Sequence, residues 1–230
     1  MSNPGFVVRC VGERRLTRGA AAMENKRMKL TTITQITLDG VTQGNGGSTE
    51  EDLRGGFDRG GWARGAGDDT TRDHIAATFQ RADAYLFGRR TYDILRDFWG
   101  TMAELKQHPI GVALNSKPKY VASTTLTRSD WANTEILGDD LFRAVADLKD
   151  SRDGELQVHG SSRLIQWLLE KDLVDEMELI TVPVVLGQGA RLFADSGRDI
   201  ALNLVDARTD SKGVMIHSYR PVGRPAYATF

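Results

Sequence analysis

The spacing of apolar and polar residues switches repeatedly between two periods along the chain. Short runs rich in β-branched and apolar residues predict strands, because such side chains suit a pleated, buried surface. These runs are 29–38, 83–87, 119–123, 134–137, 155–158 and 176–182. Apolar residues at helical spacing predict helices that begin near Asp69 and Arg89, after Asp140 and at Ser162. Two last runs, about 201–208 and 213–219, flank a turn and predict a terminal β-hairpin.

Strands that alternate with helices before a closing hairpin predict an α/β protein. We expect a mixed, mainly parallel sheet with helices on both faces. No internal repeat or linker interrupts the pattern, so we assign one domain to residues 28–220. Residues 1–27 are rich in arginine and poor in acids, which predicts a disordered basic N-terminal extension. Residues 221–230 are predicted to form a C-terminal tail.

The composition argues against several classes of protein, among them nucleic-acid-binding, membrane and metal-binding proteins. The 230 residues include 30 basic and 31 acidic ones, a net charge of −1 that argues against a nucleic-acid partner bound through bulk positive charge. No apolar run approaches the roughly 18 residues of a membrane span, so no membrane partner is expected. The single cysteine, Cys10, excludes internal disulfides and suits a reducing, cytoplasmic setting. The four histidines lack the spacing of a metal site, and we predict no metal.

A glycine-rich stretch over 39–67 shows no sustained period. Loops of this length inside a domain are uncommon and are often lids or ligand-binding segments. The stretch contains Phe57 and Trp62, two large side chains that could contact a ligand. An irregular surface loop without a functional role explains the lack of a period equally well, so a ligand-binding loop and a plain surface loop both remain open interpretations.

Two segments share the order strand, glycine turn and helix start. The first runs over 85–92 around Gly88, and the second over 156–164 around Gly160. Glycine lets backbone approach a phosphate, and a helix N-terminus offers free N–H groups, so the two turns could hold the two ends of a dinucleotide. The doublet Arg89-Arg90 would suit a 2′-phosphate, although both arginines could instead be solvated on a helix face. Neither segment is a GxGxxG or P-loop motif.

The order of several motifs resembles a known family. Gly160–Leu169, Leu173–Glu176, Val182–Gly187 and Leu192-Phe193 are similar to the reductase domain of the bacterial bifunctional deaminase-reductase of riboflavin biosynthesis. Gly88–Tyr92 and Thr37–Gly40 resemble two further motifs of that family, which belongs to the dihydrofolate reductase-like superfamily. The resemblance covers about 28–220 and implies a stand-alone member with a three-layer α/β/α fold, working as a homodimer.

The resemblance also implies the chemistry, which is hydride transfer from NADPH to a small heterocyclic, carbonyl or imine substrate. Trp62 would contact the substrate, and Ile36 would lie near the nicotinamide. The other implied cofactor contacts fall at three strand ends. They are Gly88, Arg89, Arg90 and Thr91; Ser123 and Thr124; and Gly160, Ser161, Ser162, Arg163 and Leu164.

Two departures from the family pattern affect substrate and proton donor. Riboflavin-pathway reductases carry a substrate-binding Glu just ahead of the glycine turn, and we match that position to Val158. This predicts a substrate other than 5-amino-6-(5-phosphoribosylamino)uracil. Asp73 is the counterpart of the first-helix carboxylate of dihydrofolate reductases, and Asp39 is a second candidate acid that could instead only form a turn. The alternatives are a true riboflavin-pathway reductase and a non-catalytic NADP(H)-binding regulatory module.

Overall fold

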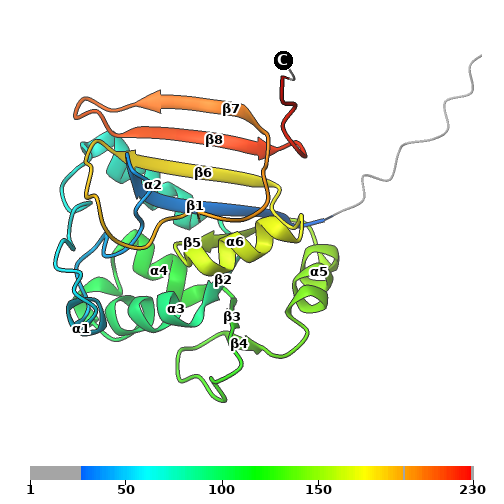
Figure 1. Cartoon of the computed structure of the whole chain (residues 1–230). Coiled ribbons are helices and arrows are strands. Elements are labelled where there is room, and N and C mark those ends of the chain that lie inside the picture. Colours follow the sequence, from blue (N-terminus) through cyan, green and yellow to red (C-terminus); the bar gives the residue numbers. More distant parts are fainter. Residues whose placement is uncertain (1–26, 194, 229–230) are drawn as a thin grey trace, which may run out of the picture.

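Eight strands form one sheet in the order β4-β3-β2-β5-β1-β6-β8-β7 (Figure 1). This computed structural model describes residues 27–193 and 195–228, so nearly all of the predicted extension over 1–27 lies outside the described residues. The strands are β1 (Lys29–Thr37), β2 (Ala84–Gly88), β3 (Lys119–Ala122), β4 (Thr134–Leu137), β5 (Glu155–His159), β6 (Glu176–Val182), β7 (Leu202–Thr209) and β8 (Met215–Pro221). The predicted strand positions are therefore confirmed.

The pairing of the strands confirms the predicted mixed, mainly parallel sheet. β1 is central and runs parallel to β5 on one side and to β6 on the other. β2 runs parallel to β5 and β3, and β3 runs parallel to β4, whereas β8 is antiparallel to both β6 and β7. The carboxyl ends of the parallel strands therefore meet at one edge, where ligands bind in open α/β sheets.

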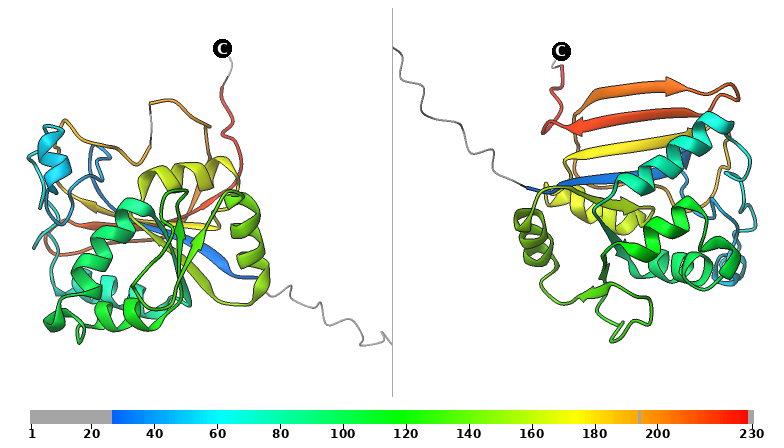
Figure 2. Two further views of the ribbon diagram at one scale, coloured as in Figure 1. Left: turned by 90° about the horizontal axis from the view of Figure 1, so that it is seen from below. Right: turned by 180° about the vertical axis from the view of Figure 1, so that it is seen from behind.

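Helices cover both faces of the sheet, as predicted (Figures 1 and 2). The α-helices are α1 (Glu50–Arg54), α2 (Asp69–Arg81), α3 (Arg89–Leu95), α4 (Pro109–Ser116), α5 (Leu141–Ser151) and α6 (Ser162–Glu170). Figure 1 shows α6 in front of the sheet and α2 behind it. None of the helices in the described part of the chain is long and apolar enough to cross a membrane.

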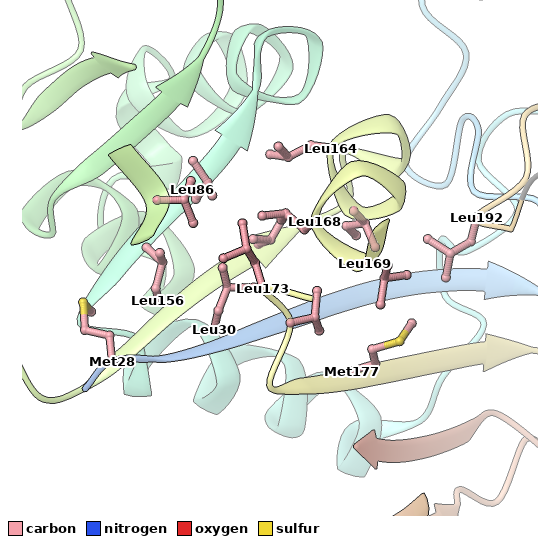
Figure 3. Close-up of a cluster of buried hydrophobic side chains, with 14 of the residues drawn as sticks. Met28, Leu30, Leu86, Leu156, Leu164, Leu168, Leu169, Leu173, Met177 and Leu192 are labelled. Atoms are coloured by element: carbon pink, nitrogen blue, oxygen red, sulfur yellow. The ribbon is translucent and has the colours of Figure 1, made fainter. Parts of the chain in front are cut away.

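The period-two alternation along the strands builds a separate core on each face. Leu30 and Ile36 of β1 face α5 and α6, where leucines of β1, β2 and β5 meet Leu164 and Leu168 (Figure 3). Ile33 of the same strand faces α2 and packs with Ile180 and the terminal hairpin. β1 is consequently buried on both sides, which fixes its register between two layers of helices.

Some local structure differs from the sequence-based expectation. The glycine-rich stretch contains α1, and the segment between α3 and β3 contains α4, neither of which the sequence pattern predicted. The helix predicted to begin near Asp69 is α2, and Asp68 is its N-cap. The segment after β8 bonds to residues 199–201: Val222 N donates to Ala201 O at 2.9 Å, and Ala201 N donates to Gly223 O at 2.8 Å.

Candidate active site

The two glycine turns predicted from sequence lie against each other at the carboxyl edge of the sheet. They meet because β2 and β5 are parallel neighbours, so both chains turn on the same side. Gly88 N donates to Ser161 Oγ at 3.0 Å, and Ser161 N donates to Thr91 Oγ1 at 3.1 Å. A Cβ on Gly88 would lie 3.4 Å from Ser161 Oγ, so the two turns are in direct contact.

The start of α6 has the backbone of an anion-binding turn. Gly160 and Ser161 both have φ of +57°, the left-handed region that few residues other than glycine adopt easily. Ser161 occupies the N-cap position but makes no side-chain cap, because its hydroxyl accepts from Gly88 instead. The first-turn amides of α6 thus keep their hydrogen-bonding capacity and the positive end of the helix dipole. Arg163 is exposed in this turn.

The other predicted cofactor residues are divided between this edge and the core. Leu164 and Ile36 are buried in the core cluster on the α6 face. Ser123, directly after β3, uses its hydroxyl to accept from the amides of Thr125 and Leu126, and Thr124 is exposed. The β3 end therefore continues the same edge of the sheet in a hydroxyl-rich turn.

Both arginines of the predicted phosphate-binding doublet are held in ion pairs. Arg89 Nε donates to Asp93 Oδ2 at 2.6 Å within α3. Arg90 Nη2 donates to Asp52 Oδ1 of α1 at 2.6 Å, and Arg90 Nε lies 3.6 Å from Glu51. Neither guanidinium is simply solvated on a helix face, and neither is free of a carboxylate partner.

The glycine-rich stretch lies across this edge of the sheet. Thr42 Oγ1 is 2.7 Å from Ser162 Oγ in α6, and Asn45 Nδ2 donates to Gln35 Oε1 of β1 at 2.8 Å. Trp62 Nε1 donates to the main-chain oxygen of Gln43 at 2.8 Å, which fixes the indole within the loop. The loop is thus tied to β1 and α6, as well as to α3 through α1.

A small cavity of about 60 Å³ opens on the α2 face beside the end of β1. Its walls come from the glycine-rich loop, α2, β1, β6 and the segment before β8. The lining residues are Gln35, Ala63, Gly65, Ala66, Gly67, Thr71, Arg72, Ile75, Ile180, Val182 and Val214. The described lining contains no carboxylate. Thr71 Oγ1 donates to Asp210 Oδ2 at 2.7 Å, so the terminal hairpin holds this wall in place.

The structure brings neither predicted acid to the cavity lining. Asp39 accepts from Thr37 Oγ1 at 2.6 Å, from Gly187 N at 2.8 Å and from Leu186 N at 3.2 Å. These hydrogen bonds, that from Thr37 above all, lower the pKa of Asp39 to about 2, so it is a carboxylate at neutral pH. Asp73 is exposed on α2. Asp39 joins the end of β1 to the loop after β6 and has no proton to donate near neutrality.

The position matched to the family's Glu needs a correction. Val158 is fully buried in the core on the α6 face, so its side chain cannot reach a ligand on the α2 face. His159 directly precedes Gly160 and faces α2, where its ring stacks on Phe79 at 3.8 Å between centroids. Its Nε2 lies 2.8 Å from Gln157 Oε1, and burial lowers the pKa of His159 to about 3, which keeps the imidazole neutral. Because successive side chains of a strand point to opposite faces, the sequence could have shown that Val158 and His159 lie on different faces of the sheet.

Comparisons with known proteins agree with this geometry. The model of the RibD C-terminal domain matches residues 28–216. The uncharacterised protein YyaP of Bacillus subtilis (strain 168) is 30% identical over 186 residues, which cover 78% of this chain and 88% of YyaP.

Two solved structures share the fold. A provisionally assigned riboflavin biosynthesis protein from Shewanella sp. PV-4 superposes with a TM-score of 0.65 at 23% identity, covering 85% of this chain and 99% of the other. Dihydrofolate reductase from Enterococcus faecalis, complexed with NADP(H), gives a TM-score of 0.56 at 11% identity, covering 85% of this chain and 98% of the other. The predicted dihydrofolate reductase-like fold is therefore confirmed.

Proposed function

Because the chain belongs to the RibD C-terminal domain family, we propose that it is an NADPH-dependent reductase acting on a small heterocyclic, carbonyl or imine substrate. The observation that carries this proposal is the contact between the two glycine turns, Gly88 N to Ser161 Oγ, at the carboxyl edge beside a cavity. We further propose that the protein works in the cytoplasm as a homodimer.

The residues at this edge fit a dinucleotide. The first turn of α6 has backbone amides without a side-chain cap and carries Arg163, a combination that suits a pyrophosphate. Gly88 and Gly160 let the two turns approach a ligand without a Cβ between them. The Enterococcus faecalis relative in fold is complexed with NADP(H), which supports a cofactor of this class.

The bound cofactor would supply a hydride to the carbon of a C=N or C=O bond, and the nitrogen or oxygen would then need a proton. The cavity lining offers an amide at Gln35, a hydroxyl at Thr71 and apolar walls at Ile75 and Ile180. Such walls exclude bulk water and orient a small planar group through one or two hydrogen bonds. Since no carboxylate is present in the described lining, we assign proton delivery to water rather than to Asp39 or Asp73.

The residues of the same cavity wall support a neutral substrate group. Among the lining side chains only Arg72 carries a charge, and it is exposed at the rim, where it pairs with Asp69. A largely apolar cavity whose one charged lining residue is a cation disfavours a cationic group. A Thermotoga maritima protein of similar fold, at 14% identity and a TM-score of 0.57, is a deaminase and 5-amino-6-(5-phosphoribosylamino)uracil reductase. We propose related hydride chemistry on a different substrate.

Titration of NADPH and NADH against the full chain, followed by tryptophan fluorescence, tests the cofactor. Ser161→Ala removes the acceptor for Gly88 N and should weaken binding of both dinucleotides about tenfold, the effect of one lost hydrogen bond at a turn. Ser151→Ala is the matched control, because that hydroxyl bonds only within the last turn of α5.

Oxidation of NADPH in the presence of dihydrofolate, pyrimidine or small carbonyl substrates tests turnover. Wild-type protein that binds neither dinucleotide contradicts the proposal. Tight binding without oxidation by any of these substrates supports the alternative of a non-catalytic NADP(H)-binding regulatory module.

A further inference from the structure

A buried carboxylate on α1 holds one of the two arginines at the predicted phosphate site. Asp52 is 3% exposed and accepts hydrogen bonds from Arg90 Nη2 at 2.6 Å and Gln43 Nε2 at 2.5 Å. Its other oxygen accepts from Thr49 N at 2.9 Å and Thr49 Oγ1 at 2.7 Å. Burial alone would raise the pKa of Asp52, but these donors outweigh it and lower the pKa to about 2, so the group is a permanent carboxylate.

The same pair determines what Arg90 can offer a ligand. Its Nη2 is committed to Asp52 and lies 3.3 Å from Thr49 Oγ1, while its Nε faces Glu51 at 3.6 Å. Arg89 is likewise committed to Asp93. The two guanidiniums of the doublet therefore lie beside three carboxylates, Asp52, Glu51 and Asp93, the last of which is shared with Arg96, so the doublet does not present two unpaired positive charges.

A phosphate that recruited Arg90 would have to compete with a partner already in place. Separating the pair leaves a buried charge without its counter-ion, which costs far more than breaking an exposed pair. NADH has no 2′-phosphate on its ribose, so its binding does not require the Asp52–Arg90 ion pair to break. The doublet therefore confers less selectivity for a 2′-phosphate than its sequence alone indicates.

We propose that Asp52 is a specificity-determining residue that acts through Arg90, lowering the preference of this site for NADPH over NADH. The inference rests on the proposed function, because it requires that a nicotinamide dinucleotide binds at the two glycine turns. Asp52 does not touch the cofactor in this proposal. It holds Arg90 in an ion pair and so withholds it from a 2′-phosphate.

The ratio of the dissociation constants for NADH and NADPH is the measurement that isolates this role. Asp52→Asn removes the negative charge, keeps one oxygen for the two Thr49 donors, and puts an amide NH2 group where Arg90 and Gln43 now donate. It should raise the preference for NADPH about tenfold, since one charge-assisted contact of Arg90 becomes available to the phosphate. A loosened α1 would weaken both dinucleotides alike and leave the ratio unchanged. Glu50→Gln is the matched control, because it removes an exposed charge from the same helical turn without touching Arg90.

Arg90→Gln provides a second test that does not depend on how well Asp52→Asn folds. If Asp52 withholds Arg90, this variant changes the ratio by less than about twofold, and it abolishes the effect of Asp52→Asn in the double variant. A tenfold loss of NADPH preference in Arg90→Gln alone overturns the inference, as does an unchanged ratio in folded Asp52→Asn. Wild-type protein that binds neither dinucleotide overturns the proposed function and this inference together.

Discussion

Acidification should destabilise the fold through the buried side chain of His159. The ring is 7% exposed and stacked on Phe79, and burial, together with the nearby Arg81, lowers its pKa from 6.5 to about 3. Between these two values the unfolded chain binds a proton that the folded chain does not. Stability is therefore complete above the unfolded pKa and falls as the pH drops below it.

The slope follows from proton linkage. One proton difference changes the free energy of unfolding by about 1.4 kcal/mol per pH unit, so about 2 kcal/mol should be lost between about pH 7 and about pH 5. Asp39 and Asp52, whose pKa values are lowered to about 2, lose their contribution only below about pH 4 and do not enter this window. The His159 shift covers the part of this interval below pH 6.5.

Urea unfolding of the wild type and His159→Gln across this range is the assay. Glutamine can still donate to Gln157 Oε1 and does not titrate, so its unfolding free energy should be nearly flat where the wild type falls. His217→Gln, which removes a half-buried histidine from β8, should keep the wild-type slope. Parallel curves for the wild type and His159→Gln would refute the linkage argument, whatever the absolute stability of the variant.

Two further predictions concern the end of β1 and the assembly. Asp39→Asn should lower the urea midpoint of unfolding at neutral pH, because an amide cannot accept from Thr37, Leu186 and Gly187 as the carboxylate does. Urea unfolding at neutral pH measures this loss, and an unchanged midpoint would contradict the anchoring role. A homodimer should give twice the chain mass of 25.4 kDa in light scattering. A single mass of 25.4 kDa at micromolar concentration would contradict it.

Strands and long helices of this fold could be predicted because burial imposes its period on their sequences. α4 could not be predicted, because it contains Pro109 and Gly111 and its 8 residues are too few to show a helical period. Gly111 is required there, since a Cβ would lie 2.1 Å from the main-chain oxygen of Leu105. α1 has only five residues, and a reciprocal cap between Thr49 and Asp52 stabilises it rather than helix propensity.

Part of the candidate site could likewise be predicted from the sequence, and part could not. That Gly88 and Gly160 share an edge follows from parallel strands, which the alternating pattern implies. The partners of the arginines could not be predicted, because Asp52 and Arg90 are 38 positions apart and nothing periodic relates them. Neighbouring residues of a strand point to opposite faces of the sheet, so the sequence already implied that Val158 and His159 lie on different faces of β5. The family's Glu was matched to Val158, whose side chain lies in the core on the α6 face. A family motif must therefore be aligned to the correct face of the strand as well as to the correct position.

We expect the loop between β1 and α2 to determine the specificity of the proposed site. The edge of the sheet is a general feature, since a dihydrofolate reductase at 11% identity shares it. The loop contacts α6 through Thr42, contacts α3 through Asp52, and supplies Ala63 and Ala66 to the cavity wall. One segment therefore touches both proposed phosphate turns and the proposed substrate cavity. Substitutions at the exposed positions of this loop are therefore expected to change cofactor preference and substrate while leaving the strands intact, because the sheet is stabilised by the core on each of its faces.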